Sequence, residues 1–425
     1  MNINNSTSLL VWIFQTGEPL QIDDKNARPM RAVSLSNSLL DAGHKVVLWS
    51  TDFYHQEKRH RYNKYKRIKM SDKFEIRLIP TMGYKRNIGI GRLLDHAQLA
   101  FRLKKLLSEE ESSPDIAFIG FPPIETAYLL AKWLKKRDIP SILDVKDLWP
   151  VIFLDPLPKL IRPLGKLALF PYFYLAKKAI KDVTGVTTMA NKFLDSTLGF
   201  IGREKTNKDG VFFLTSPKFR VSDSQLNEAR KWWDSKGIID NGKHRLCFIG
   251  SLSYAFDFHP IYKAAKIALE KNNNIEIIIC GEGSCSEKIK KMMSGLSNVH
   301  FPGWIDRPKI ETLAKRCIGS LAPYINIDSF INSIPNKIID ALSLGLPILS
   351  PLKGEVASII NQHNVGLKYD SDGDDSLYNC LKILQKDNEL RKAMAKNALN
   401  LYEDQFSFEK TYDSLVKHLE TLASY

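Results

Sequence analysis

Ile275-Glu-Ile-Ile-Ile-Cys-Gly-Glu-Gly-Ser284 joins an apolar run to a glycine-rich turn. The first six residues are almost continuously apolar, which predicts a strand that is buried on both faces. The glycines after the strand permit a sharp turn and the close approach of a ligand to the backbone. A strand of this kind is typical of a parallel sheet that is covered by helices on both sides.

Comparable apolar runs recur along the chain in two series, each about as long as one doubly wound domain. The first series comprises residues 9–14, 45–49, 75–79, 115–119 and 141–145, with helix-like segments at 29–42, 91–108 and 123–137. The second series comprises residues 246–249, 275–280, 299–301, 319–322, 347–349 and 365–368. This alternation predicts an α/β protein with two doubly wound, Rossmann-like domains and a ligand cleft between them.

The domain boundaries follow from the same pattern. We expect an N-terminal, acceptor-binding domain at residues 1–216 and a C-terminal, donor-binding domain at residues 217–400. A helix at residues 401–425 is expected to pack back toward the N-terminal domain. The polar stretch at 215–243 is expected to link the two domains.

The composition is that of a globular protein in a reducing compartment. Of the 425 residues, 44% are hydrophobic and 25% are charged, and this length favours two cores over one. The five cysteines form no metal-ligand or disulfide spacing, so we expect them to be small buried side chains. The start lacks the features of a secretory signal, and no apolar run is long enough to span a bilayer. We therefore expect a cytoplasmic protein.

The net charge of +14 is concentrated in the first half of the chain. Residues 1–216 hold 34 Lys and Arg against 22 Asp and Glu, whereas the remainder holds 27 against 25. The N-terminal half would therefore meet any polyanion, unless its cations are simply solvated. Residues 58–69 contain seven Lys or Arg and two tyrosines, which suits an anionic membrane surface, RNA or a solvated loop. No nucleic-acid-binding motif accompanies them, so we expect no nucleic-acid partner.

A second segment, residues 157–178, is rich in Leu, Phe and Tyr, with Lys and Arg recurring among them. Such a segment can lie in a bilayer interface. It can equally be an amphipathic helix that covers the sheet. Both interpretations stay open from the residues alone.

Ligands of doubly wound domains bind beyond the carboxyl ends of the strands, so the loops there are candidate sites. Gly250 and Ser251 follow the first strand of the second series. Gly281-Glu282-Gly283 precedes a helix whose N-terminus would suit a phosphate, although many such turns are purely structural. Trp304 and Ile305 follow the third strand and can border a planar base.

A polar turn, Asn332-Ser-Ile-Pro-Asn336, leads into a short apolar helix ahead of a buried strand. Pro335 suits the first turn of a helix, where its missing N–H has no cost. Asn332 or Ser333 can cap that helix. A structural cap explains these residues without any ligand.

The residues that follow indicate a function for the same turn. The free N–H groups of the first helical turn, at Asn336 and beyond, would hold a diphosphate with Lys337 nearby. Asp340, one turn farther, can accept hydrogen bonds from vicinal sugar hydroxyls. A purely structural cap does not explain Lys337 and Asp340 together.

Four motifs of the second half form a joint array. They are Gly-Ser-Leu at 250–252, Gly-Glu-Gly at 281–283, Pro-Gly-Trp at 302–304, and Ser-Ile-Pro-Asn-Lys-Ile-Ile-Asp-Ala-Leu-Ser-Leu-Gly-Leu-Pro at 333–347. This array resembles the donor half of GT-B glycosyltransferases, specifically the large retaining family, of the family 4 type, that builds bacterial surface polysaccharides. That family has two acids separated by seven residues. Asp340 matches the second acid, which contacts the nucleotide ribose, while Asn332 stands where the acid that meets the donor sugar is usual.

The chain also departs from this family at the first donor loop. The family often places an Arg and a Lys on the donor phosphates after the first strand, and Gly250-Ser251 and the residues after it lack both. Lys337 is our candidate for the missing positive charge.

The first half contains seven further short motifs. They are Gln15-Thr-Gly-Glu-Pro-Leu20, Arg28-Pro-Met-Arg31, Gly43-His-Lys-Val46, Thr51-Asp-Phe-Tyr-His55, Tyr84-Lys-Arg-Asn87, Asp95-His96 and Asp144-Val-Lys-Asp-Leu-Trp-Pro150. Together they resemble the branch of that family that extends O-antigen or capsule units. The resemblance covers nearly the whole chain and implies a UDP-activated, N-acetylated deoxysugar as donor.

The acceptor side is expected in this first half. Asp147 and Trp149 follow a buried strand, where Asp147 can orient or deprotonate an acceptor hydroxyl, or serve only as a cap or ion-pair partner. Gly17 would let the first loop approach the diphosphate. Arg28 or Arg31 would hold an acceptor phosphate.

These features predict metal-independent sugar transfer without a cofactor, because helix N-termini can replace a cation at the diphosphate. Retention of configuration is implied by the resemblance. The expected acceptor is a saccharide on a polyprenyl diphosphate, with the protein docked peripherally at the inner face of the cytoplasmic membrane through residues 58–69 and 157–178. Two alternatives are a nucleotide-sugar 2-epimerase on the same fold and a non-catalytic, membrane-associated protein that binds nucleotide sugars.

Overall fold

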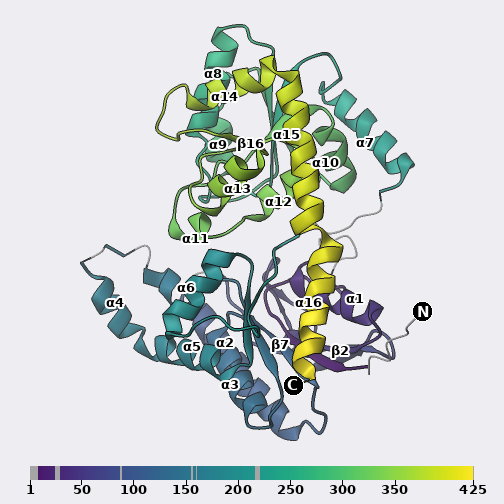
Figure 1. Cartoon of the computed structure of the whole chain (residues 1–425), viewed down its shortest axis with the longest axis vertical. Helices are drawn as coiled ribbons and strands as arrows, with labels where there is room; N and C mark the ends of the chain where they lie inside the picture. The colour runs from purple at the N-terminus through teal and green to yellow at the C-terminus, as the bar shows by residue number, and fades with distance from the viewer. Residues whose placement is uncertain are drawn as a thin grey trace. The chain divides into compact units, whose positions relative to one another are not determined.

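The computed structural model describes residues 8–23, 29–86, 89–154, 157–158, 160–215 and 221–424. The chain forms two compact units (Figure 1). Unit 1 is Met1–Phe213 with Thr411–Tyr425, and unit 2 is Leu214–Lys410. Each unit is built round its own largely parallel sheet, which confirms the expected α/β class with two Rossmann-like units.

The sheet of unit 1 has eight strands. In spatial order they are β10 (Gly210–Val211), β9 (Gly185–Thr188), β8 (Ser141–Val145), β7 (Ile116–Phe121), β1 (Leu10–Phe14), β2 (Lys45–Thr51), β6 (Phe74–Ile79) and β5 (Lys66–Lys69). All neighbours are parallel except β5, which pairs antiparallel with β6. The basic segment 58–69 is therefore not a plain loop, because it supplies this edge strand. It also supplies β4 (Arg59–His60), which pairs with β3 (Phe53–Tyr54).

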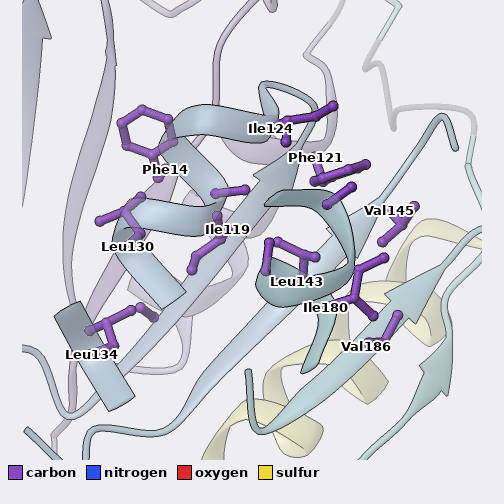
Figure 2. Close-up of a cluster of buried hydrophobic side chains, with 14 of the residues drawn as sticks. Phe14, Ile119, Phe121, Ile124, Leu130, Leu134, Leu143, Val145, Ile180 and Val186 are labelled. Atoms are coloured by element: carbon purple, nitrogen blue, oxygen red, sulfur yellow. The ribbon is translucent and has the colours of Figure 1, made fainter. Parts of the chain in front are cut away.

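Helices cover both faces of this sheet. The helical segments of this unit are α1 (Arg31–Asp41), α2 (Ile90–Glu109), α3 (Ile124–Lys135), the 3-10 turn η1 (Val151–Leu154), α4 (Arg162–Ala168), α5 (Phe170–Asp182), α6 (Asn191–Ile201) and α16 (Phe408–Ala423). Figure 2 shows part of the core, where Phe14, Ile119 and Leu143 of the strands meet Leu130 of α3 and Ile180 of α5. All five side chains are buried.

Within the segment 157–178, the two helices α4 and α5 differ in burial. Helix α5 buries Phe173, Ala176, Ala179 and Ile180, and the last three belong to the same core cluster as the strands, as expected of an amphipathic covering helix. Helix α4 buries none of its residues. No helix within the described residues is long and apolar enough to cross a membrane.

Unit 2 has a six-stranded, fully parallel sheet. In spatial order its strands are β13 (Val299–Gly303), β12 (Ile275–Cys280), β11 (His244–Ile249), β14 (Cys317–Leu321), β15 (Ile348–Ser350) and β16 (Gly366–Lys368). Its helices are α7 (Asp223–Ser235), α8 (His259–Glu270), α9 (Ser286–Met292), α10 (Arg307–Ala314), α11 (Asp328–Ile331), α12 (Asn336–Ser343), α13 (Glu355–His363), α14 (Ser376–Lys386), α15 (Asn388–Leu401) and the π-helix η2 (Tyr402–Phe406).

Helix α7 changes the expectation of a simple linker at 215–243. A capping box of Ser222 and Gln225 starts this helix. Trp233 is fully buried, and its indole N–H donates to the carbonyl of Lys309 in α10 at 2.9 Å. Most of the supposed linker is thus a packed part of unit 2.

A buried ion pair joins distant elements of unit 1. Arg31, at the start of α1, places Nε 2.8 Å from Asp144 Oδ2 of β8, with both side chains at most 2% exposed. Arg31 Nη2 donates to Asp144 Oδ1 at 2.9 Å, and Nη1 donates to the Phe212 carbonyl at 2.9 Å. Thr187 of β9 donates to the same Asp144 oxygen at 2.8 Å. The pair therefore ties α1 to three neighbouring segments of the sheet.

Replacing Arg31 should be strongly destabilising, because Asp144 would keep a buried charge without its cation. We expect Arg31→Ala to lower the free energy of unfolding by about 3–5 kcal/mol. Arg67→Ala is the matched control, since Arg67 forms an ion pair that is about half exposed, and should cost less than about 1 kcal/mol. Urea unfolding followed by circular dichroism measures both. Equal, small effects would mean that the Arg31 pair does not hold the unit together.

Candidate active site

Three loops meet at the carboxyl edge of the unit 2 sheet, because β11, β12 and β13 are parallel neighbours. The Gly250 N–H donates to the Cys280 carbonyl at 2.9 Å. The Gly281 N–H donates to the Gly303 carbonyl at 2.8 Å. These bonds hold the three strand-end loops together.

Glycine is required where these loops touch. Gly281 has a φ of +123°, which side-chain-bearing residues rarely adopt. A Cβ there would overlap the Gly250 carbonyl, and a Cβ on Gly283 would overlap the backbone of Leu252. Glu282, between them, points outward to Ser286 and Lys290, which lower its pKa. Ser251 is also exposed.

Lys337 reaches this loop cluster from helix α12. Its Nζ donates to the carbonyl of Ile249, the last residue of β11. The same atom lies 4.0 Å from the centre of the Phe248 ring and 5.1 Å from that of Phe256. A Cβ on Gly250 would overlap this ammonium group. The cation therefore lies beside the first strand-end loop, as the hypothesis of a substitute phosphate ligand requires.

The start of α12 differs from the expectation. Pro335 holds the N-cap position, while Asn332 is the C-cap of the preceding helix α11. Neither Asn332 nor Ser333 occupies the predicted cap position. The Ile338 N–H donates to the Pro335 carbonyl at 2.9 Å, and the Tyr324 hydroxyl hydrogen-bonds the backbone of Lys337. The first turn thus offers fewer N–H groups to a diphosphate than the sequence suggested, so Lys337 gains importance.

Asp340 and the two candidates for contact with the nucleotide base, Trp304 and Ile305, also lie in unit 2. Burial raises the pKa of Tyr324, and the charge of nearby Asp340 raises it further. Asn336 is exposed at the start of α12. Trp304 is 74% exposed, whereas Ile305 is buried, so that only its backbone can reach a ligand.

Unit 1 contains a polar cavity of about 180 Å³. Two predicted residues, Gly17 and Asp147, line it. The sequence assigned no role to most of the other polar residues that line it, which are Gln15, Thr16, Glu18, Thr51, His55, Tyr84, Arg92, Asp95, His96 and Lys146. Some of them fall in the short motifs 51–55, 84–87 and 95–96, but nothing in those motifs indicated a shared cavity.

The side chain of Asp147 is in contact with solvent. It lies in the cavity, however, so that protein walls replace part of the water around it. The loss of solvent at these walls raises its pKa above the ordinary 3.8, while the positive charges of Lys146 and Arg92 lower it. Lys146 itself forms an ion pair with Glu18 and donates to Gln15 at 3.1 Å. Asp147 can therefore accept a proton more readily than an ordinary carboxylate.

Two histidines line the same cavity in their neutral form. Burial, together with Arg92 and His55, lowers the pKa of His96 to about 3. Its buried Nδ1 has no hydrogen-bond partner among the described residues. Burial, together with Lys58 and Arg92, lowers the pKa of His55 to about 4, and its Nδ1 lies 2.6 Å from the Tyr84 hydroxyl. His96 thus has hydrogen-bonding capacity left for a ligand.

Two sequence predictions for unit 1 change, and a third is not tested. Arg31 cannot hold an acceptor phosphate as expected, because its guanidinium is buried and committed to Asp144 and a backbone carbonyl. Trp149 is buried and lines a separate apolar groove, so it is not part of the polar cavity. Arg28 lies outside the described residues.

The described residues include no group of three or more His, Cys, Asp or Glu side chains that could hold a metal ion. The cysteines are free, and four of the five are buried.

Residues 230–401 match the family model of glycosyl transferases group 1. The fold matches sucrose-phosphate synthase from Thermosynechococcus elongatus with a TM-score of 0.66 at 11% identity, covering 98% of this chain and 99% of that one. It matches HepE of Anabaena, solved with UDP and glucose, with a TM-score of 0.63 at 13% identity, covering 98% and 100%. It also matches WaaG, a glycosyltransferase involved in lipopolysaccharide biosynthesis, with a TM-score of 0.62 at 14% identity, covering 97% and 99%. No curated protein sequence matches the chain.

These matches define the class of protein. The fold over nearly the whole chain is the GT-B fold of these glycosyltransferase structures. Most of unit 2 carries the group 1 glycosyl transferase domain. The match of residues 230–401 to this family model indicates a glycosyltransferase.

Because the glycine loops touch, one added methyl group at Gly281 should strongly weaken the binding of a nucleotide. Gly281→Ala should displace the 250–252 loop and Lys337, and weaken the binding of a nucleotide diphosphate about tenfold or more. Gly295→Ala is the control, since Gly295 also has a positive φ (+86°) but open space around it. Isothermal titration with UDP measures both variants. If the two variants bound UDP equally well, the loop cluster would not be the nucleotide site.

Proposed function

We propose that this enzyme moves a sugar from a UDP-sugar to a saccharide on a polyprenyl diphosphate, in the synthesis of a bacterial surface polysaccharide such as O-antigen or capsule. The observation that carries the donor part is Lys337 beside the glycine loops 250–252 and 281–283. HepE, which shares the fold, was solved with UDP-glucose, and this supports a UDP-sugar as donor. The acceptor part rests on the polar cavity of unit 1 and on the resemblance to O-antigen and capsule transferases.

The proposed donor site uses charge and backbone in place of a metal. Lys337 would offset the charge that develops on the leaving diphosphate. Asp340 would accept hydrogen bonds from the ribose hydroxyls, and the exposed Trp304 would border the base. Asn332, in place of an acid, would meet the donor sugar through a neutral amide.

The proposed chemistry on the acceptor side centres on Asp147. Its carboxylate would take the proton of the acceptor hydroxyl while the hydroxyl oxygen bonds to the sugar's anomeric carbon. The bond from that carbon to the diphosphate breaks, and UDP leaves with the electron pair. Neutral His96 would orient the acceptor through its buried Nδ1. The family resemblance implies retention of configuration, so the hydroxyl would approach the anomeric carbon from the face that the diphosphate leaves.

Membrane docking is best supported for helix α4 and its flanks. Leu160, Leu164, Leu167 and Phe170 are each more than 60% exposed. The basic segment 58–69 is less suited than its composition suggested, because several of its cations already pair with carboxylates. The pairs are Arg59 with Glu57, Arg61 with Asp23, Arg67 with Glu75 and Lys69 with Asp72. We therefore assign the larger share of docking to residues 157–178.

The donor proposal predicts selective binding of one nucleotide that depends on Asp340. In saturation-transfer NMR against UDP-, GDP- and TDP-sugars, we expect UDP-sugars alone to bind. The Asp340→Ala variant should bind UDP-sugars about tenfold more weakly, because the ribose hydroxyls lose their acceptor. Asp372→Ala, an exposed carboxylate elsewhere in unit 2, should bind as the wild type does. Conversion of the donor sugar without acceptor would favour the 2-epimerase, and binding without any turnover would favour a non-catalytic role.

The same enzyme preparation tests the acceptor and the membrane. Transfer to a polyprenyl-diphosphate-linked saccharide in anionic vesicles should persist in EDTA. It should also slow as salt rises from about 0.05 to about 0.5 M, because screening weakens surface attraction. Transfer that requires a divalent cation would overturn the role of Lys337. Indifference to both salt and lipid charge would overturn anionic docking.

The role of Asp147 predicts a shift in the pH profile. The base must be a carboxylate, so kcat/KM should fall as the pH drops through its raised pKa. Lys146→Met removes a charge that lowers this pKa, so the acid limb should move to higher pH. Lys136→Met, an exposed lysine on the same unit, should leave the profile in place. An acid limb that stays fixed in Lys146→Met would argue against Asp147 as the base.

A further inference from the structure

An apolar groove of about 240 Å³ lies next to the polar cavity of unit 1. Its walls come from the start of α2, from Trp149 and the turn η1 that follows it, and from the junction of α4 and α5. The side chains that matter are Ile90, Leu93, Trp149, Phe153, Leu169 and Tyr172. The hydroxyl of Tyr172 hydrogen-bonds Glu125 outside this set, and burial with Glu125 raises its pKa to about 12. Tyr172 therefore contributes its ring to the groove.

Arg92 lines both the groove and the polar cavity. Its guanidinium lies 4.8 Å from the centre of the Trp149 ring, in the groove wall, and 5.6 Å from that of Tyr84, in the cavity wall. Lys58 Nζ lies 4.6 Å from the centre of the same Tyr84 ring. Two cations thus lie near the ring of Tyr84 in the cavity wall, and one of them, Arg92, also lines the apolar groove.

The groove is also continuous with exposed apolar surface. Leu169 and Tyr172 lie in the groove. Leu167, just before them in the chain, is 72% exposed, and Phe170, between them, is 63% exposed. In Figure 1, α4 and α5 follow one another at the periphery of unit 1. Polar cavity, cations, apolar groove and exposed apolar helix therefore follow one another in that order.

We propose that this groove holds the first isoprene units of a polyprenyl diphosphate, with the diphosphate at Arg92 and Lys58. The inference rests on the proposed function, since it places the lipid of the proposed acceptor. A polyprenyl diphosphate has the same order of parts: a saccharide, an anionic diphosphate and a hydrocarbon chain. The saccharide then occupies the cavity with Asp147 and His96, and the rest of the chain leaves along α4 toward the bilayer.

Farnesyl diphosphate is a soluble probe that carries both the diphosphate and three isoprene units. By isothermal titration, we expect the full-length protein to bind it about tenfold or more tightly than inorganic pyrophosphate, because the groove buries hydrocarbon. Farnesol alone should bind weakly. Arg92→Ala should weaken the binding of farnesyl diphosphate and of pyrophosphate to the same extent.

Two neighbouring leucines of α2 provide a matched pair. Leu93 lines the groove, whereas Leu94 is 53% exposed and lies outside it. Leu93→Asp should reduce farnesyl diphosphate binding to the level of pyrophosphate, and Leu94→Asp should not. If Leu93→Asp fails to fold, as judged by thermal unfolding, Ile90→Asp replaces it, because Ile90 is 76% exposed at the rim of the groove.

Equal losses in the two leucine variants, or farnesol binding as tight as farnesyl diphosphate, would overturn the assignment. So would a change of oligomeric state in Leu93→Asp with lipid binding intact, since the groove would then serve self-association. A different result would overturn the proposed function without overturning the lipid site. A protein that binds farnesyl diphosphate in the groove, yet transfers no sugar to a prenyl-linked saccharide, supports the lipid site and overturns the proposed acceptor.

Discussion

The ion pair between Arg31 and Asp144 is the constraint on which the rest of unit 1 depends. Asp144 is the penultimate residue of β8, and Lys146 and Asp147 follow that strand directly into the polar cavity. Because Asp144 also accepts a hydrogen bond from Thr187 of β9, the carboxyl end of β8 is held from both sides. Burying two charges is costly, but breaking such a pair leaves one charge buried and unpaired, which is more costly still. Here it fixes the backbone that presents the proposed base.

Unit 2 positions its candidate groups by a different means. Its glycine loops touch through backbone atoms, and a lysine from a distant helix lies against them. Because glycines occupy the positions where the loops touch, the polar groups there are backbone N–H and C=O groups and the Lys337 ammonium. A diphosphate needs both, since charge neutralisation and directed N–H groups act on different oxygens. In the proposed function, unit 1 supplies a carboxylate, neutral imidazoles and cations for the acceptor, and unit 2 supplies a cation for the donor.

The sequence predicted what is periodic or local and missed what is long-range. Continuous apolar runs identified the central strands of both sheets, because burial on both faces leaves a clear pattern. The two-residue β10 and the threonine-rich β9 carry no such pattern, and the lysines of β5 concealed an edge strand. Gly17 and Asp147, which line the polar cavity, were predicted because each directly follows, or nearly follows, a predicted strand.

The other cavity residues come from segments far apart in the chain. His55, Tyr84 and His96 meet only after folding, so no spacing in the sequence could associate them. Arg31 was misjudged for the same reason, since its partner Asp144 lies 113 positions away. The glycines of unit 2 were easier to interpret, because a glycine directly after an apolar strand typically marks a sharp turn or a close backbone approach.

Helix α16 has a consequence for how the protein is made. Residues 411–425 belong to unit 1, with Tyr412, Leu415 and Leu419 buried there and Glu420 Oε1 2.9 Å from His44 Nε2 (Figure 1). During synthesis, the whole of residues 214–410 leaves the ribosome before this helix exists. The N-terminal unit must therefore wait, with an apolar surface uncovered, while the second unit folds. Its last element is synthesised only after the second unit, so the unit that begins first is completed last.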